Sequence, residues 1–143
     1  MRTALAATWT LLLGMALLML GAGLQGTLVG LRASLEGFPT LLAGIMLAAY
    51  YLGYMVGSVM TPGLVNSVGH VRVFAALTSL ASVLILLQGI FVAPLPWTLV
   101  RILSGFCFAG IYVVAESWLN GRVDNEHRGL LLSLYMLVCY AGL

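Results

Sequence analysis

The chain has 143 residues, of which 62% are apolar and only 7% are charged, with a formal net charge of +2. A soluble domain of this size lacks the interior volume to hide so much apolar surface, whereas a lipid bilayer accepts it as an exterior. The composition therefore excludes an ordinary soluble protein and predicts a polytopic membrane protein. It contains no block of basic residues, so we expect no nucleic-acid partner.

Long apolar runs predict an all-α transmembrane bundle. A spanning helix needs about 20 apolar residues to cross the roughly 30 Å of hydrocarbon. Four runs reach this length and a fifth falls short: Ala4–Leu31, Leu41–Val65, Phe74–Ala93, Trp97–Leu119 and Gly129–Leu143. The first run is nearly twice the length of a signal-peptide core, so we expect it to be retained. The short fifth run, which would reach only about 22 Å, predicts a fragment or truncated product of a longer protein.

The connections between these runs are short, which favours antiparallel neighbours in a bundle. We expect them at 32–40, 66–73, 94–96 and 120–128. Arginine then falls mainly on one side of the membrane, at Arg2, Arg72, Arg122 and Arg128, with Arg32 on the other. Because Lys and Arg stay cytoplasmic, this predicts a cytoplasmic N-terminus.

Small residues and tryptophans support the same bundle. Close helix contact in lipid depends on small residues, and pairs four apart occur at Gly53 with Gly57 and at Gly105 with Ala109. The first run adds more glycines, at Gly14, Gly21, Gly23, Gly26 and Gly30. The tryptophans lie near predicted helix ends, where the headgroup region suits their rings: Trp9, Trp97 and Trp118.

Arg101 is the sharpest candidate for function, because it lies about one turn inside the outer end of the fourth run. A cation at that depth must reach the headgroups, pair, or line a water-filled cavity. At about 100° per residue, Gly105, Phe108, Tyr112 and Glu116 fall in the same sector of the helix. That mixture of residues is typical of a helix lining a polar path rather than of one facing lipid.

Each of the other polar residues within the apolar runs has two possible roles. Glu116 is either solvated near the inner end of its helix or handles a proton or cation during transport. The amide of Gln25 can serve a solute or another helix, and Gln88 has the same two options. Tyr50 and Tyr54 share one face of the second helix, where they either pack or line a cavity.

Enzyme and metal chemistry have no sequence signal. No Ser-His-Asp arrangement, metal-ligand cluster or phosphate-binding glycine loop is visible, so we expect neither an enzyme nor a cofactor. Cys107 and Cys139 lie inside apolar runs, which predicts buried thiols rather than a disulfide framework.

The second connection resembles the signature loop between helices two and three of the major facilitator superfamily (MFS). In the family a Gly is followed four residues later by an Asp, then by a basic residue, a Gly and further basic residues. Pro62, Asn66 and Ser67 stand in place of the first Gly, the Asp and the first basic residue, and Gly69 and Arg72 match the later ones. The resemblance implies a gating loop at Asn66, Gly69 and Arg72, altered by loss of the Asp charge.

Two further segments resemble the same superfamily. Arg101 followed by Gly105 and the small residues Ala109 and Gly110 is similar to its fourth-helix motif, whose Arg is implicated in proton coupling in many members. The segment 125–129 is similar to the loop that leads into helix five. Phrases at 35–38 and 116–120 resemble a bacterial subgroup of uncharacterised transporter-like proteins.

The resemblance implies the first four helices and part of the fifth of a twelve-helix fold, residues 1–143 being a partial N-terminal half. It implies a secondary transporter of the bacterial cytoplasmic membrane that moves a small solute by alternating access, with proton coupling as one form. The missing C-terminal half would complete the site, and the substrate-pathway candidates are Gln25, Arg101, Tyr112 and Glu116. The alternative is an integral-membrane scaffold or assembly protein without transport.

Overall fold

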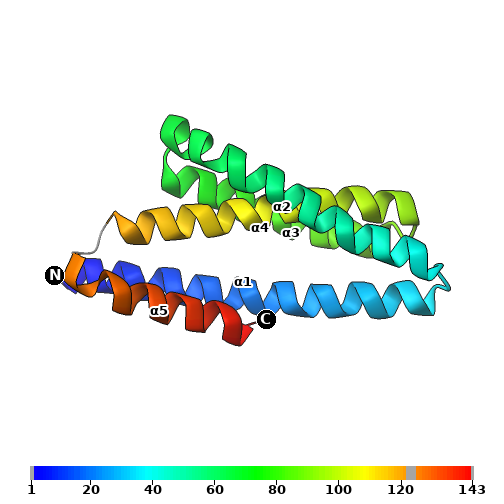
Figure 1. Cartoon of the computed structure of the whole chain (residues 1–143), viewed down its shortest axis with the longest axis horizontal. Coiled ribbons are helices and arrows are strands. Elements are labelled where there is room, and N and C mark those ends of the chain that lie inside the picture. Colours follow the sequence, from blue (N-terminus) through cyan, green and yellow to red (C-terminus); the bar gives the residue numbers. More distant parts are fainter. Residues whose placement is uncertain (1, 122–124, 143) are drawn as a thin grey trace. The chain divides into compact units, whose positions relative to one another are not determined.

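The structure is a computed structural model that describes the backbone of residues 2–121 and 125–142 and the side chains of residues 8–121 and 128–142. Every regular element in this part of the chain is a helix (Figure 1), in the order α1 (Arg2–Leu35), α2 (Thr40–Val68), α3 (His70–Ile90), α4 (Pro94–Asn120) and α5 (Asn125–Gly142). The all-α prediction is therefore confirmed. Arg122, and the side chain of Arg2, both used to orient the chain, lie outside the described residues.

Four helices have the length and composition to cross a membrane, as the apolar runs predicted. They are Thr8–Leu35 within α1, and α2, α3 and α4 over their full lengths, with mean hydropathy between 1.5 and 2.1. The apolar part of α5, Arg128–Gly142, is shorter. Buried positions are most frequent in α4, at 61% of its most apolar window against 22–28% in the other three. The fourth helix is thus the most enclosed element of the described chain.

The first two connections are shorter than the sequence indicated, because residues beyond the apolar runs remain helical; the first is 36–39. The expected third loop at 94–96 is wrong, since α4 begins at Pro94 and the connection is 91–93. Proline suits the first helical turn, where its fixed φ matches the helix and its missing N–H is not needed.

Between α2 and α3 the expected loop of eight residues reduces to Gly69 alone. Its backbone has φ 93° and ψ 155°, a region that is essentially restricted to glycine. The Gly69 N–H donates to the Val65 carbonyl at 2.9 Å, and the Gly69 carbonyl accepts from the Val73 N–H at 3.2 Å. A side chain at Gly69 would strain this tight reversal between two long helices.

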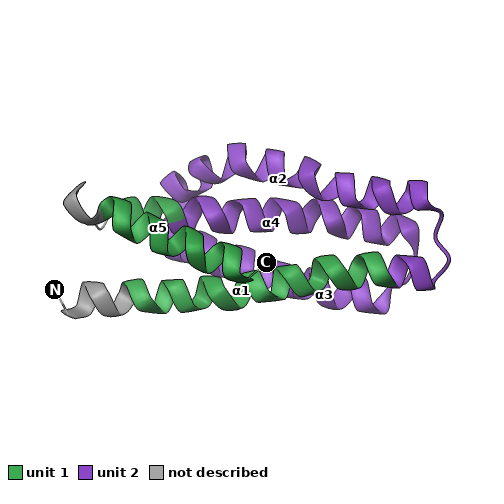
Figure 2. Cartoon of the chain, turned by 60° about the horizontal axis from the view of Figure 1, so that its bottom comes forward, with its two compact units in different colours: residues 1–31, 116–143 green, residues 32–115 purple. Residues whose placement is uncertain are grey.

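The chain divides into two compact units, shown in different colours in Figure 2. The first, here the central unit, is residues 32–115; the second, the terminal unit, is residues 1–31 with 116–143. In the central unit α2, α3 and most of α4 lie side by side (Figures 1 and 2).

Glycines hold α2 against α4 in the central unit, as the four-residue spacing predicted. A Cβ on Gly53 would overlap the backbone of Ile102, and one on Gly105 would overlap the carbonyl of Tyr50. At Gly57 a Cβ would lie 2.5 Å from the Phe106 carbonyl oxygen. Since real Cβ atoms do not approach so closely, the two backbones can touch only where these glycines stand.

The glycines of α1 do not follow this pattern. A Cβ at Gly14, Gly21, Gly26 or Gly30 would meet no atom within 4 Å, so these four glycines make no close contact within the described chain. Close packing through the glycines of α1 stays a prediction. In the terminal unit the close approach uses Gly142 of α5 instead, where a Cβ would lie 2.6 Å from the Cβ of Met19. Both cysteines are free and buried, as predicted.

Candidate functional site

The side chain of Arg101 is turned into the central unit and keeps only 7% of its surface exposed. Its guanidinium carbon lies 4.6 Å from the centre of the Tyr50 ring on α2, the geometry of a cation–π contact. A guanidinium that reached for the outer headgroups would be largely exposed. The burial of the Arg101 side chain therefore argues against an interfacial position from which it would snorkel to the headgroups.

A row of tyrosines connects Arg101 to Tyr112 along the contact between α2 and α4. The ring of Tyr54 lies 6.3 Å from that of Tyr50 and 6.4 Å from that of Tyr112, measured between centroids. All three rings are half-buried. The structure thus places Arg101 and Tyr112, two of the four substrate-pathway candidates, at opposite ends of one row of contacts that runs through Tyr50 and Tyr54.

The middle of this face is a packing contact. Gly105 lies against the backbone of Tyr50 and Tyr54, and Phe108 is 3% exposed. Residues 101 and 112 flank the contact at either end, so the polar groups of the face are separated by a tight helix crossing. The sequence pattern did not show that Gly105 and Phe108, in the middle of this helix face, serve packing, while the polar residues lie on either side of them.

Ser104 is a buried polar residue that the sequence reasoning missed. Its side chain has no exposed surface, and its hydroxyl has no hydrogen-bond partner. It lies three residues after Arg101, and side chains at this spacing are neighbours on a helix surface. The available signal was this spacing, which places a hydroxyl within one helical turn of Arg101.

Gln25 and Glu116 belong to the terminal unit. Gln25 is 7% exposed and has an interaction partner, so its amide is engaged rather than free. Glu116 is half-buried near the end of α4, within electrostatic range of Cys139 on α5. These two residues remain pathway candidates on their own helices.

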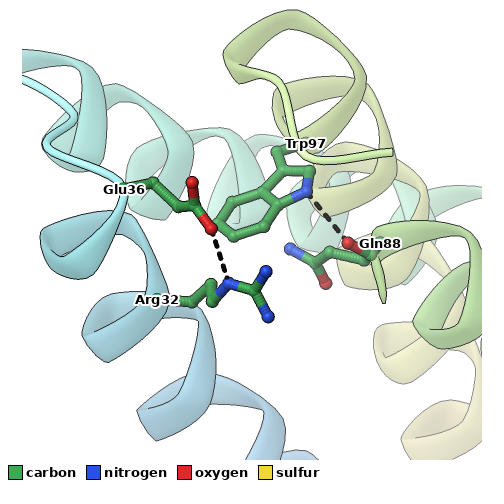
Figure 3. A network of polar contacts seen from close by, with 4 residues as sticks. All are labelled: Arg32, Glu36, Gln88 and Trp97. Atoms are coloured by element: carbon green, nitrogen blue, oxygen red, sulfur yellow. Dashed lines mark hydrogen bonds and ion pairs between the residues drawn. The ribbon is translucent and has the colours of Figure 1, made fainter. Parts of the chain in front are cut away.

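A second polar cluster lies where α3 ends and α4 begins (Figure 3). The indole Nε1 of Trp97 donates to the backbone carbonyl of Gln88 at 3.0 Å, and the Trp97 ring meets Phe38 edge-on with centroids 5.6 Å apart. The Arg32 Nε donates to the Glu36 carboxylate at 2.9 Å beside them. Trp97 is 2% exposed, so its ring is packed inside the protein, whereas Trp9 is 63% exposed.

The gating-loop candidates lie around the turn at Gly69. Asn66, near the end of α2, and Arg72, in the first turn of α3, are both exposed. Gly69 sets the reversal between them through its backbone conformation. Among the described residues, no three His, Cys, Asp or Glu side chains gather closely enough to hold a metal ion.

Comparison with known proteins assigns the family. The family model described as sugar (and other) transporter matches residues 6–143. An uncharacterised MFS-type transporter of Enterobacter sp. (strain 638) is 32% identical over 132 residues, which cover 92% of this chain and 35% of the relative. Uncharacterised MFS-type transporters named YcaD from Salmonella arizonae and Escherichia fergusonii match with the same identity and coverage.

No solved structure matches the chain significantly. The chain spans about 35% of the length of the relatives it matches, so it corresponds to a part of those proteins. With four apolar helices long enough to cross a membrane, the family match makes it a multi-pass membrane protein. The chain belongs to the sugar (and other) transporter family, within the major facilitator superfamily.

Proposed function

We propose that the chain is the N-terminal part of a secondary active transporter that moves a small solute by alternating access. The observation that carries the proposal is the burial of Arg101, whose guanidinium lies over Tyr50 inside a bundle of membrane-spanning helices. A buried cation in a span is costly unless it serves a partner or a cavity. In a family of transporters, a solute pathway is the simplest use of such a cation.

Within this proposal each pathway candidate has a role. Arg101 supplies positive charge, while Tyr112 and Gln25 supply hydrogen bonds to the solute. Glu116 handles a proton if transport is coupled to protons. Asn66, Gly69 and Arg72 form the cytoplasmic gating loop. The remaining two thirds of the relatives' length would provide the second half of the site.

We also propose that the protein lies in the bacterial cytoplasmic membrane with its N-terminus inside. The relatives are bacterial, and the arginines between the helices are biased to the side of Arg72 and Arg128. Excess positive charge remains on the cytoplasmic side during insertion.

The test is solute uptake by the full-length gene product in proteoliposomes, with an Arg101→Ala variant. We expect Arg101→Ala to abolish uptake of any solute that the parent protein transports, because the variant removes the buried charge. Membrane insertion should be almost unchanged, as judged by the amount of monodisperse protein recovered.

Arg32→Ala is the matched control, since Arg32 is also an arginine but is 54% exposed in its side chain and paired with Glu36. We expect it to transport at close to the parent rate. Unchanged uptake by Arg101→Ala would contradict the proposed role of Arg101. Absence of uptake for every solute class, with folded parent protein, would favour the non-transporting scaffold.

A further inference from the structure

The guanidinium of Arg101 makes no hydrogen bond to any residue that the structure describes. Its Nε has no exposed surface and no partner. The ring of Tyr50 covers one face of the group at 4.6 Å. Guanidinium N–H groups point outward in the plane of the group, so a contact with its face uses none of them. The in-plane donors of Arg101 are therefore left for a ligand.

Ser104 offers an additional donor beside Arg101. Hydroxyls in apolar helices usually bond back to a carbonyl of their own helix. Several in this chain do so, including Thr61 to Gly57 at 2.7 Å and Ser82 to Thr78 at 3.0 Å. The Ser104 hydroxyl is completely buried and lacks such a bond. It is an unpaired polar group next to an unpaired cation.

Among the residues whose side chains the structure describes, no carboxylate is placed to neutralise Arg101. The sequence has four acidic residues, Glu36, Glu116, Asp124 and Glu126. Glu36 is paired with Arg32. Glu116 is fifteen residues further along α4, which corresponds to about 22 Å of helix. Asp124 and the side chain of Glu126 lie outside the described residues. A buried charge without a countercharge is unfavourable, so this position favours an incoming anion.

We infer that Arg101 and Ser104 form a subsite for the oxyanion of the transported solute, a carboxylate or a phosphate, with the Tyr50 ring supporting the guanidinium. The inference rests on the proposed transport function and narrows its substrate class to organic anions. Two anion oxygens can take the in-plane N–H groups of Arg101, and one of them can also accept from the Ser104 hydroxyl. A neutral sugar would leave the buried charge uncompensated.

The test measures the electrostatic preference of the subsite without knowing the solute. Ser104→Cys is placed in the full-length gene product with Cys107, Cys139 and any further cysteines replaced by Ala, in phosphatidylcholine nanodiscs. Its reaction rates are compared for an anionic ethylsulfonate and a cationic trimethylammonium methanethiosulfonate. A positive charge within about 6 Å should favour the anionic reagent about tenfold or more.

The matched control is the same protein with Arg101→Gln, in which the ratio of the two rates should fall to about one. Acetate and inorganic phosphate should slow the anionic reagent in the Arg101 protein, compared with chloride at equal ionic strength. Slowing that requires phosphatidylglycerol in the disc would identify a lipid headgroup as the occupant and overturn the inference. A ratio near one with Arg101 present would show a protein carboxylate already bound there, and would also overturn it.

A thiol at Ser104 that neither reagent reaches would overturn the inference as well, because no solute anion could then enter. If Ser104→Cys does not fold, the thermal unfolding of the protein with Ser104 intact is measured instead of the reagent rates. Acetate or phosphate should then give a higher unfolding midpoint than chloride does, and this difference should be absent in Arg101→Gln. No difference between the anions would overturn the proposal. If the protein takes up only neutral solutes and this uptake depends on Arg101, the transport function stands and the anion subsite is rejected. If the anionic reagent is preferred but no solute is taken up, the anion subsite stands and the transport function is rejected.

Discussion

At the scale of single residues, the most informative position on the fourth helix is Arg101. The sequence placed it inside a span but left open whether it reached the headgroups. The structure buries it and sets it over Tyr50, a contact worth about 0.5–2 kcal/mol depending on desolvation. That attraction does not replace the hydrogen bonds that a guanidinium makes in water, and this supports the proposal that Arg101 binds a polar ligand.

Trp97 has a role in the packing of two helices that the sequence did not predict. Its position near a helix end suggested the headgroup region, but its indole donates to the Gln88 carbonyl near the end of α3. Carbonyls in the last turn of a helix have no partner within that helix. Trp97 satisfies one of them, a relationship between two helices that no local pattern in the sequence contains.

We predict that Trp97→Phe lowers the free energy of unfolding by about 1–3 kcal/mol, because the Gln88 carbonyl is left buried without this donor. The measurement is the midpoint of SDS-induced unfolding in mixed micelles. Trp9→Phe is the control, since Trp9 is 63% exposed and should change the midpoint little. Equal effects of the two substitutions would show that the hydrogen bond is unimportant for stability.

At the scale of the helices, the contact between α2 and α4 was the part of the packing that spacing predicted well. Gly53 and Gly57 are one turn apart, and both meet the α4 backbone. The glycines of α1 have similar spacing but face open space, because a small residue permits a close approach without requiring one. Whether a glycine lies in a close helix contact depends on the neighbouring helix, so the sequence of one helix alone cannot predict it.

Gly105→Ala should destabilise the central unit by about 1–3 kcal/mol, since the added Cβ would overlap the Tyr50 carbonyl and force the two helices apart. Gly44→Ala on α2 is the matched control because a Cβ there meets nothing within 4 Å. Relief of the glycine helix penalty should leave that variant equal to the parent or up to about 1 kcal/mol more stable. The same SDS titration measures both, and an undisturbed Gly105→Ala would contradict the close contact.

Helix limits show what the sequence could and could not provide. Length and hydropathy located all four spans, because these are the quantities that a bilayer selects. The ends were misplaced because polar residues such as Arg32 and Arg72, which lie outside the apolar runs, are also helical. Ser104 was missed for a different reason, since whether a hydroxyl bonds back to its helix depends on its rotamer and neighbours.

At the scale of the whole molecule, the membrane explains the exposed apolar surface. Leu13, Leu17 and Leu24 of α1 are each more than 60% exposed, and comparable residues cover α2 and α3. In water such surfaces would drive aggregation, whereas in lipid they form the exterior. The family match and the four spans agree with this environment, and the chain represents 35% of the length of its relatives.

The most direct test of the account is the accessibility of the Arg101 face of α4 from both sides of the membrane. Tyr112→Cys is compared with Leu103→Cys, at a position 47% exposed on the outer surface of the central unit, in the full-length cysteine-free protein. A membrane-impermeant maleimide is added to right-side-out and to inside-out vesicles. Alternating access predicts that Tyr112→Cys reacts from either side and Leu103→Cys from neither. Reaction of Tyr112→Cys from one side only, or from neither, would contradict the proposed transport pathway.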